Sequence, residues 1–154
     1  MAFVVFILAC AAAATPGVVL RPGTWYRRLA KPVWRPPDWL FGPVWLLLYI
    51  SIAFSGWLVW RKAEPDEAVL ALGIYALQLL LNGLWSVVFF GLRRPDLAVL
   101  EILGLWLSIV ATIAVFAAVD ARAALLLVPY LLWVSFAALL NFSIWRLNPA
   151  RPSS

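Results

Sequence analysis

Long apolar segments separated by short polar ones dominate this chain. Charged residues are almost absent from residues 2–20, 40–61, 68–92, 96–119 and 122–146. Each segment has roughly the 17–25 residues that a helix needs to cross the hydrocarbon core of a bilayer. The strict alternation of apolar and polar positions that a membrane β-barrel requires is absent. The pattern therefore predicts an all-α membrane protein, a bundle of five transmembrane helices forming one domain over residues 1–154.

Composition supports this prediction. The chain is 66% hydrophobic and 12% charged, and its mean hydropathy is +0.97. A soluble domain of this size covers much of its surface with polar side chains, and this chain has too few of them. The first segment lacks the basic residues that open a signal peptide, so we expect it to remain as a helix. The single Cys10 excludes an intrachain disulfide.

The distribution of Lys and Arg predicts how the bundle is oriented, because cytoplasmic loops carry an excess of these residues. Nine of the twelve cations fall on one side of the predicted bundle and three on the other. The nine are Arg21, Arg27, Arg28, Lys31, Arg35, Arg93, Arg94, Arg146 and Arg151, and the three are Arg61, Lys62 and Arg122. We therefore expect the first loop and the C-terminus to face the cytoplasm. Because these cations border the membrane, they indicate contact with lipid phosphates and no nucleic-acid partner.

One face of the third segment is polar. Tyr75, Gln78, Asn82 and Trp85 are spaced three, four and three residues apart, which places them on one side of a helix. Amide side chains in hydrocarbon are costly without partners, so this face should point into the bundle. Two interpretations stay open, a hydrogen-bond clamp between helices and the polar part of a ligand pocket.

Small residues mark two further helix faces, where another helix could approach closely. They are Ala9, Ala13 and Gly17 on the first segment, and Gly73, Ala76 and Gly83 on the third. We favour packing within one chain for the first set and a homodimer contact for the second.

Glu101 is the one ionisable side chain well inside an apolar segment. It is either part of a proton or ligand path or the partner of an Arg at the membrane boundary, and we favour the pairing. At the other end of the chain, Asn148-Pro149 should end the last helix, and the residues after it are expected to be disordered.

The available side chains favour binding over catalysis. The chain has no His, one Cys and few acids, which leaves no metal site and no pair of nucleophile and base. It has ten Trp and four Tyr, which suit a large, flat, mostly apolar ligand. The stretch from Thr24 to Tyr49 is rich in both Trp and Pro, and its prolines forbid a continuous helix through its first half. This Pro- and Trp-rich loop between the first two helices is either an interfacial connector or a stiff lid over a pocket.

The aromatic and proline motifs resemble those of the TspO/MBR family, the family of the translocator proteins and of the bacterial tryptophan-rich sensory proteins. The resemblance rests on Trp25-Tyr26, Leu29, Lys31-Pro32, Trp34, Pro36-Pro37, Trp39, Gly42, Trp45, Gln78, Asn82, Trp85, Phe89-Phe90-Gly91, Pro129-Tyr130, Trp133, Phe136-Ala137, Asn141 and Trp145-Arg146. It covers nearly the whole chain in order. It implies a five-helix bundle, usually dimeric, that binds porphyrins such as protoporphyrin IX and haem, and synthetic benzodiazepine and isoquinoline ligands.

The resemblance also implies a set of ligand-binding residues. Positions matched to the family are Tyr26, Trp34, Trp45, Asn82, Phe89, Trp133 and Ala137, and the helix faces add Tyr49, Gln78, Trp85 and Tyr130. Trp45 and Trp133 match two tryptophans implicated in light-dependent porphyrin degradation, so they are the catalytic candidates if there is any catalysis. Porphyrin or haem is then a ligand, and no obligatory cofactor or metal is expected.

The family's cholesterol-recognition pattern is incomplete here, because it needs a Tyr where this chain has Phe142. We therefore do not expect cholesterol binding, and the compact chain looks more bacterial than mitochondrial. The leading hypothesis is a porphyrin receptor or sensor. The alternatives are a porphyrin or lipid transporter, a light-dependent porphyrin-degrading enzyme and a structural partner protein. The absence of an internal repeat argues against a common transporter architecture.

Overall fold

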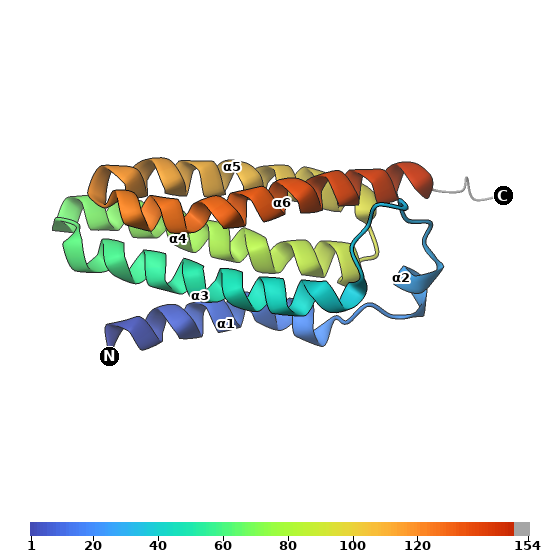
Figure 1. Ribbon diagram of the computed structural model, residues 1–154, viewed down its shortest axis with the longest axis horizontal. Coiled ribbons are helices and arrows are strands. Elements are labelled where there is room, and N and C mark those ends of the chain that lie inside the picture. Colours follow the sequence, from blue (N-terminus) through green and yellow to red (C-terminus); the bar gives the residue numbers. More distant parts are fainter. Residues whose placement is uncertain (150–154) are drawn as a thin grey trace.

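The computed structural model of the protein describes residues 1–149, and its long helices coincide with the five apolar segments. They are α1 (Ala2–Val19), α3 (Asp38–Lys62), α4 (Pro65–Ser86), α5 (Pro95–Val119) and α6 (Ala121–Leu147) (Figure 1). Each of these five helices, in the part of the chain that is described, is long and apolar enough to cross a membrane. The all-α membrane fold is therefore confirmed. The helix ends lie within three residues of the predicted ones, except that α4 stops at Ser86, six residues before the predicted end at residue 92. The expected disorder after Pro149 concerns residues outside the described part.

The helices run alternately up and down the bundle. In Figure 1, α1, α4 and α6 point one way, and α3 and α5 point the other. The first loop, the connection from α4 to α5 and the end of α6 meet at one end, which we call the loop end. The N-terminus and the two short connections from α3 to α4 and from α5 to α6 lie at the opposite end.

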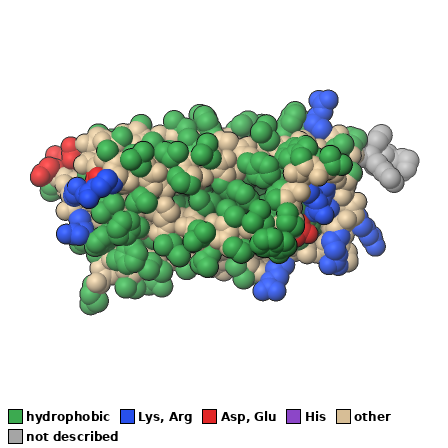
Figure 2. Space-filling model, in the orientation of Figure 1, with side chains coloured by type: hydrophobic (Ala, Val, Ile, Leu, Met, Phe, Trp, Pro, Cys, Tyr) green, Lys and Arg blue, Asp and Glu red, His purple; other side chains and the backbone are tan. Residues whose placement is uncertain are grey.

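The five helices close into a ring. α1 packs on α3 and α4, α3 packs on α6, and α5 joins α6 back to α4. Side chains that face the interior include the polar Gln78, Asn82 and Asn141, all of which are buried. The outward faces carry exposed Leu and Val, and Figure 2 shows an apolar belt with cations at both ends. Helices satisfy their own backbone groups, which is what a lipid-facing surface requires.

Local sequence explains where the helices begin. Pro65 and Pro95 occupy first-turn positions, where the missing N–H would have no partner within the helix. Glu64 and Glu67 form a capping box at the start of α4, and Asp120 accepts a backbone hydrogen bond from Arg122 at the start of α6. Short polar connections therefore end one helix and start the next with little chain between them.

Two short elements were not predicted. The first loop contains a five-residue helix, α2 (Thr24–Arg28), which ends before the first proline of the cluster. At the end of α4 the chain continues as a π-helical turn, η1 (Val87–Gly91). Such wide turns occur often at functional sites. Both elements lie at the loop end of the bundle.

The assignment of Gly83 to a homodimer contact is wrong. Gly83 is buried, and a Cβ there would lie 3.1 Å from the carbonyl oxygen of Ala13 in α1. A Cβ on Gly17 would similarly lie 3.3 Å from the Ser86 hydroxyl of α4. These small residues let α1 and α4 approach each other within one chain, as expected for the first segment. Gly73, by contrast, is exposed and has open space beside it.

The expected pairing of Glu101 with an arginine is also wrong. Both carboxyl oxygens of Glu101 are buried and have no hydrogen-bond partner among residues 1–149. The nearby Arg94 instead forms an ion pair with Asp96, with 2.6 Å between Arg94 Nη2 and Asp96 Oδ2. Asp96, in the first turn of α5, therefore pairs with an arginine near the boundary where Glu101 was expected to find a partner.

Candidate ligand cavity

A cavity of about 680 Å³ opens inside the ring near the loop end. Its walls come from α1, α3, α4, η1 and α6, and α2 with its flanking residues contributes Pro22, Tyr26 and Arg27. No residue of α5 lines it. Ligand pockets for small molecules have volumes of about 300–1,000 Å³, so the space suffices for a ligand of that size.

The structure gathers most of the predicted site residues around this cavity. Eight of the eleven line it: Tyr26, Trp45, Tyr49, Asn82, Trp85, Phe89, Trp133 and Ala137. Gln78, Tyr130 and Trp34 are not among the residues that line it. Residues that line it but were not predicted as site residues include Phe41, Phe90 and the two charged residues Arg27 and Asp38.

Gln78 and Tyr130 lie behind the wall and hold Asn82 in place. The Tyr49 hydroxyl donates to Asn82 Oδ1 at 2.5 Å, and Asn82 Nδ2 donates to the Tyr130 hydroxyl at 2.8 Å. The Tyr130 hydroxyl in turn donates to Gln78 Oε1 at 2.9 Å. This network connects α3, α4 and α6. The interpretation of the polar face of α4 as a clamp between helices is therefore confirmed, and Asn82 also faces the cavity.

A second amide network fixes the wall formed by Trp85. The indole Nε1–H of Trp85 donates to Asn141 Oδ1 at 3.0 Å. Asn141 Nδ2 donates to the carbonyl oxygen of Pro95, also at 3.0 Å. Asn141 lines the cavity and is buried. The sequence places it in line with Tyr130 and Trp133, but that alignment alone did not make it a predicted site residue.

Aromatic rings form much of the cavity surface. Trp85 and Phe89 stack with ring centroids 5.0 Å apart, and Trp45 and Tyr49 lie 5.5 Å apart. Trp133 meets Phe41 edge to face at 5.5 Å. Rings in such arrangements are held by their neighbours and present flat apolar surfaces. The cavity is therefore suited to a broad, flat, apolar molecule.

Tyr26 of α2 closes part of the loop side of the cavity. It is buried and packs edge to face on Phe89 and Phe90 at 6.2 and 5.6 Å. The Lys31 ammonium lies 4.5 Å from the centre of its ring. Burial, reinforced by the charge of Asp38, raises the pKa of the Tyr26 hydroxyl above its ordinary value. The interpretation of this loop as a lid is consistent with the position of Tyr26.

Two hydrogen bonds fasten the first loop to the end of α6. The Ala30 N–H donates to Asn148 Oδ1 at 2.9 Å, and Asn148 Nδ2 donates back to the Ala30 carbonyl oxygen at 2.8 Å. Asn148 caps α6 with the same amide, which reaches the carbonyl oxygen of Ile144. The sequence marks Asn148 only as a helix end, and no local signal indicates its partner 118 residues away.

Polar groups in the cavity wall are few. Trp133 lines the cavity, and its indole Nε1–H is buried without an acceptor in the described part of the chain. A buried donor without a partner is uncommon, since it has lost its hydrogen bonds to water. Trp133 therefore offers a donor to an acceptor atom of a ligand. Among residues 1–149, no group of three or more His, Cys, Asp or Glu side chains is placed to hold a metal ion.

A closed ring of membrane-length helices around this cavity defines a multi-pass membrane protein with an internal cavity lined by aromatic side chains. The pattern of the TspO/MBR family matches residues 3–146, and the chain therefore belongs to this family.

Relatives that are similar in sequence cover between 80% and 99% of this chain. Protein CrtK of Rhodobacter capsulatus is 46% identical over 148 residues, which are 96% of this chain and 92% of the relative. The tryptophan-rich sensory protein of Cereibacter sphaeroides is 41% identical, over 99% of this chain and 94% of the relative. The human translocator protein is 40% identical, over 80% of this chain and 75% of the relative.

Proposed function

We propose that this protein is a membrane receptor or sensor that binds a porphyrin, such as protoporphyrin IX or haem, in the cavity. The observation that carries the proposal is the cavity itself, about 680 Å³ of space walled by aromatic rings inside the helix ring. Benzodiazepine and isoquinoline ligands, which are also flat and mostly apolar, would occupy the same space. The name of one relative, tryptophan-rich sensory protein, agrees with a sensor, whereas the name translocator protein agrees with the alternative of a transporter.

The chemistry of the wall suits a tetrapyrrole. The rings of Trp45, Trp85 and Phe89 offer flat contacts to the macrocycle. Trp133 Nε1–H offers a hydrogen bond to an acceptor on its rim, and Arg27 beside the cavity offers a partner for a carboxylate. Because the chain has no His, ring contacts carry the binding of haem in this proposal, and metal-free protoporphyrin IX binds with comparable affinity.

The proposed receptor is a homodimer in a bacterial membrane. The similarity to bacterial relatives supports that location. The exposed Gly73 and Ala76 on the outer side of α4 support a contact between two copies there. The loop end faces the cytoplasm in this proposal, on the basis of the Lys and Arg distribution.

The test is the affinity and dissociation rate of protoporphyrin IX for three variants with matched helical content. Trp133→Ala removes a ring and a donor from the wall, and we expect it to lose about 1–3 kcal/mol of binding free energy, the range for stacking on an aromatic side chain. Tyr26→Ala opens the loop side and mainly speeds dissociation.

Trp57→Ala is the control. Trp57 packs against Phe3, with ring centroids 5.6 Å apart, and does not line the cavity. Its substitution should leave binding unchanged. Small and equal effects of all three substitutions would mean that the porphyrin partitions into the surrounding detergent, and the proposal would fail.

A second candidate function is light-dependent porphyrin degradation, because Trp45 and Trp133 both line the cavity. An enzyme of this kind would bleach the bound porphyrin in light and not in darkness. Trp45→Phe and Trp133→Phe keep a ring but remove the indole, so they should slow bleaching more than they weaken binding. Equal bleaching by the unmodified protein and both variants would exclude this candidate.

A further inference from the structure

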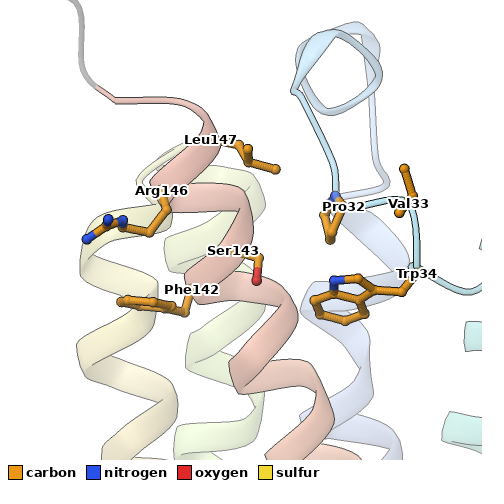
Figure 3. A pocket seen from close by; sticks show the side chains of 7 residues that line it. All are labelled: Pro32, Val33, Trp34, Phe142, Ser143, Arg146 and Leu147. Carbon is orange, nitrogen blue, oxygen red and sulfur yellow. The ribbon is translucent and has the colours of Figure 1, made fainter.

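A second concavity lies outside the ring, on the outer surface of α6 at the loop end. It is a groove of about 390 Å³, and none of its residues lines the central cavity. Figure 3 shows the loop residues Pro32, Val33 and Trp34 on one side of the groove and α6 on the other. On α6, Phe142 and Arg146 extend away from the loop, and Ser143 and Leu147 lie between.

The walls of the groove are apolar and already ordered. The Trp34 ring is 48% exposed, yet it is held edge to face by Phe136 with 5.7 Å between ring centroids. Phe142 is 44% exposed and meets Trp145 in the same way, also at 5.7 Å. The Ser143 hydroxyl donates to the carbonyl oxygen of Leu139, so it adds no free donor to the groove. Two large rings are thus kept exposed where lipid chains surround the bundle.

One residue that lines the groove, Arg146, is positively charged. Arg146 lies one helical turn beyond Phe142 toward the end of α6, and its guanidinium carbon is 6.0 Å from the centre of the Phe142 ring. Arg146 makes no ion pair with any of residues 1–149. Beside Trp145 in the last turn of α6, it lies where headgroups meet hydrocarbon. The groove therefore joins an apolar slot to an uncompensated positive charge.

We propose that this groove binds one phospholipid with an anionic headgroup. The lipid phosphate pairs with the Arg146 guanidinium, and an acyl chain lies along the slot between Trp34 and Phe142. Guanidinium groups match phosphate oxygens in geometry and charge, and basic residues at the membrane surface attract anionic lipids. A neutral sterol would fill the slot but leave the charge of Arg146 without a partner. The role of Trp34 is then contact with this lipid, outside the central cavity.

The experiment places the full chain in nanodiscs of phosphatidylcholine and phosphatidylglycerol, with bromine on the acyl chains of one lipid at a time. Bromine quenches a tryptophan that it touches, and the difference between the unmodified chain and Trp34→Phe isolates the signal of Trp34. We expect brominated phosphatidylglycerol to quench Trp34 at a mole fraction roughly five-fold lower than brominated phosphatidylcholine, the preference that one basic residue supplies.

Charge variants test the assignment to Arg146. Arg146→Gln should abolish the preference for phosphatidylglycerol, and Arg146→Lys should keep most of it. Arg61→Gln is the matched control, because Arg61 lies 4.8 Å from the Trp57 ring at the opposite end of the bundle, and neither residue lines the groove. It should leave the Trp34 signal unchanged.

Several results would overturn the proposal. Equal quenching of Trp34 by the two lipids would mean ordinary annular contact, and this comparison needs only the unmodified chain and Trp34→Phe. Loss of the preference in millimolar inorganic phosphate would indicate a site for the free anion. Displacement of phosphatidylglycerol by an equal fraction of cholesterol would indicate a sterol groove. No porphyrin is present in any of these measurements, so their outcome is independent of the proposed receptor function.

Discussion

Asp120 is the residue at which three helices meet. It ends α5 and caps α6, and its Oδ2 lies 2.7 Å from Lys62 Nζ at the end of α3. The same oxygen lies 3.2 Å from Arg122 Nη2. The hydrogen bond from Arg122, followed by that from Lys62, lowers the pKa of the Asp120 carboxyl below its ordinary value. One carboxylate thus joins two connections at the end of the bundle opposite the loop.

The lowered pKa of Asp120 predicts a pH-dependent stability. Because the folded-state pKa lies below the unfolded value of about 3.9, the stabilisation is present at neutral pH and is lost as the pH falls below about 4. Asp120→Asn should lower the unfolding temperature in detergent at pH 7 and lower it less at pH 3. Asp66→Asn, at an exposed acid in the first turn of α4, is the control. An equal difference at both pH values would contradict the assignment.

At the residue scale, the sequence predicts which side of a helix a side chain faces. It predicts less well whether that side chain lies at the end of the ring that contains the cavity. Tyr75, Gln78, Asn82 and Trp85 do face the interior, as their spacing indicates. Only Asn82 and Trp85 line the cavity, because the cavity occupies one end of the ring. Helical periodicity contains no information on that boundary, which depends on which neighbouring rings fill the space.

Helices α1 and α4 come together at Gly83. This contact predicts that substitution destabilises the fold at Gly83 but not at Gly73, another glycine of α4. Gly83→Leu would push a side chain into the backbone of Ala13, so we expect a loss of about 1–3 kcal/mol in folding free energy, as for other overpacked sites. A Cβ at Gly73 would meet nothing within 4 Å in the same chain, so Gly73→Leu should leave the folding of the single chain unchanged. Thermal unfolding in detergent measures both. Equal destabilisation would mean that helix propensity and not the contact with α1 decides the outcome.

The attachment of the first loop to α6 predicts a second effect at the element scale. Asn148→Ala removes the two hydrogen bonds to Ala30. Because these groups are exposed to water, we expect a modest cost of about 1 kcal/mol, which is roughly a five-fold increase in loop opening. Faster proteolysis within residues 29–37 measures the opening directly. Under the proposed function, the dissociation of protoporphyrin IX should accelerate by a similar factor.

The control for Asn148→Ala is Ser143→Ala, since the Ser143 hydroxyl bonds only within α6. It should change neither proteolysis nor dissociation. Unchanged proteolysis in Asn148→Ala would show that the loop is held by the aromatic contacts of Tyr26 alone.

The five long helices were predictable because the bilayer imposes a minimum apolar length that the sequence displays directly. The elements α2 and η1 were not predictable, because each has only five residues. So short a segment does not repeat a helical pattern of apolar positions often enough for the pattern to be identified. The partners of the loop escaped prediction for a related reason. Tyr26 packs on Phe89 and Phe90, and Ala30 bonds to Asn148, all far away in the sequence. Contacts of this kind exist only after the ring of helices has closed.

On the scale of the whole molecule, the two ends of the bundle differ in charge. Among the residues that the structure describes, eight Lys and Arg residues belong to the loop end and three to the other end, and the sequence assigns Arg151 to the same side as the eight. At the opposite end, Lys62 and Arg122 are paired with Asp120. Only Lys and Arg near the membrane, and not the net charge, determine orientation, so the acids of that end do not alter the expectation.

The last prediction is that the loop end faces the cytoplasm. A fluorescent protein fused to the C-terminus should be bright, and alkaline phosphatase at the same position should be inactive, because it folds only after export. Replacing Arg21, Arg27 and Arg28 with Gln reduces the difference between the ends from nine against three to six against three, and it should produce a mixed orientation. Replacing Glu64, Asp66 and Glu67 with their amides is the control and should change nothing. An active phosphatase on the unmodified chain would mean that the orientation is the reverse, and the loop end, near which the cavity lies, would then face away from the cytoplasm.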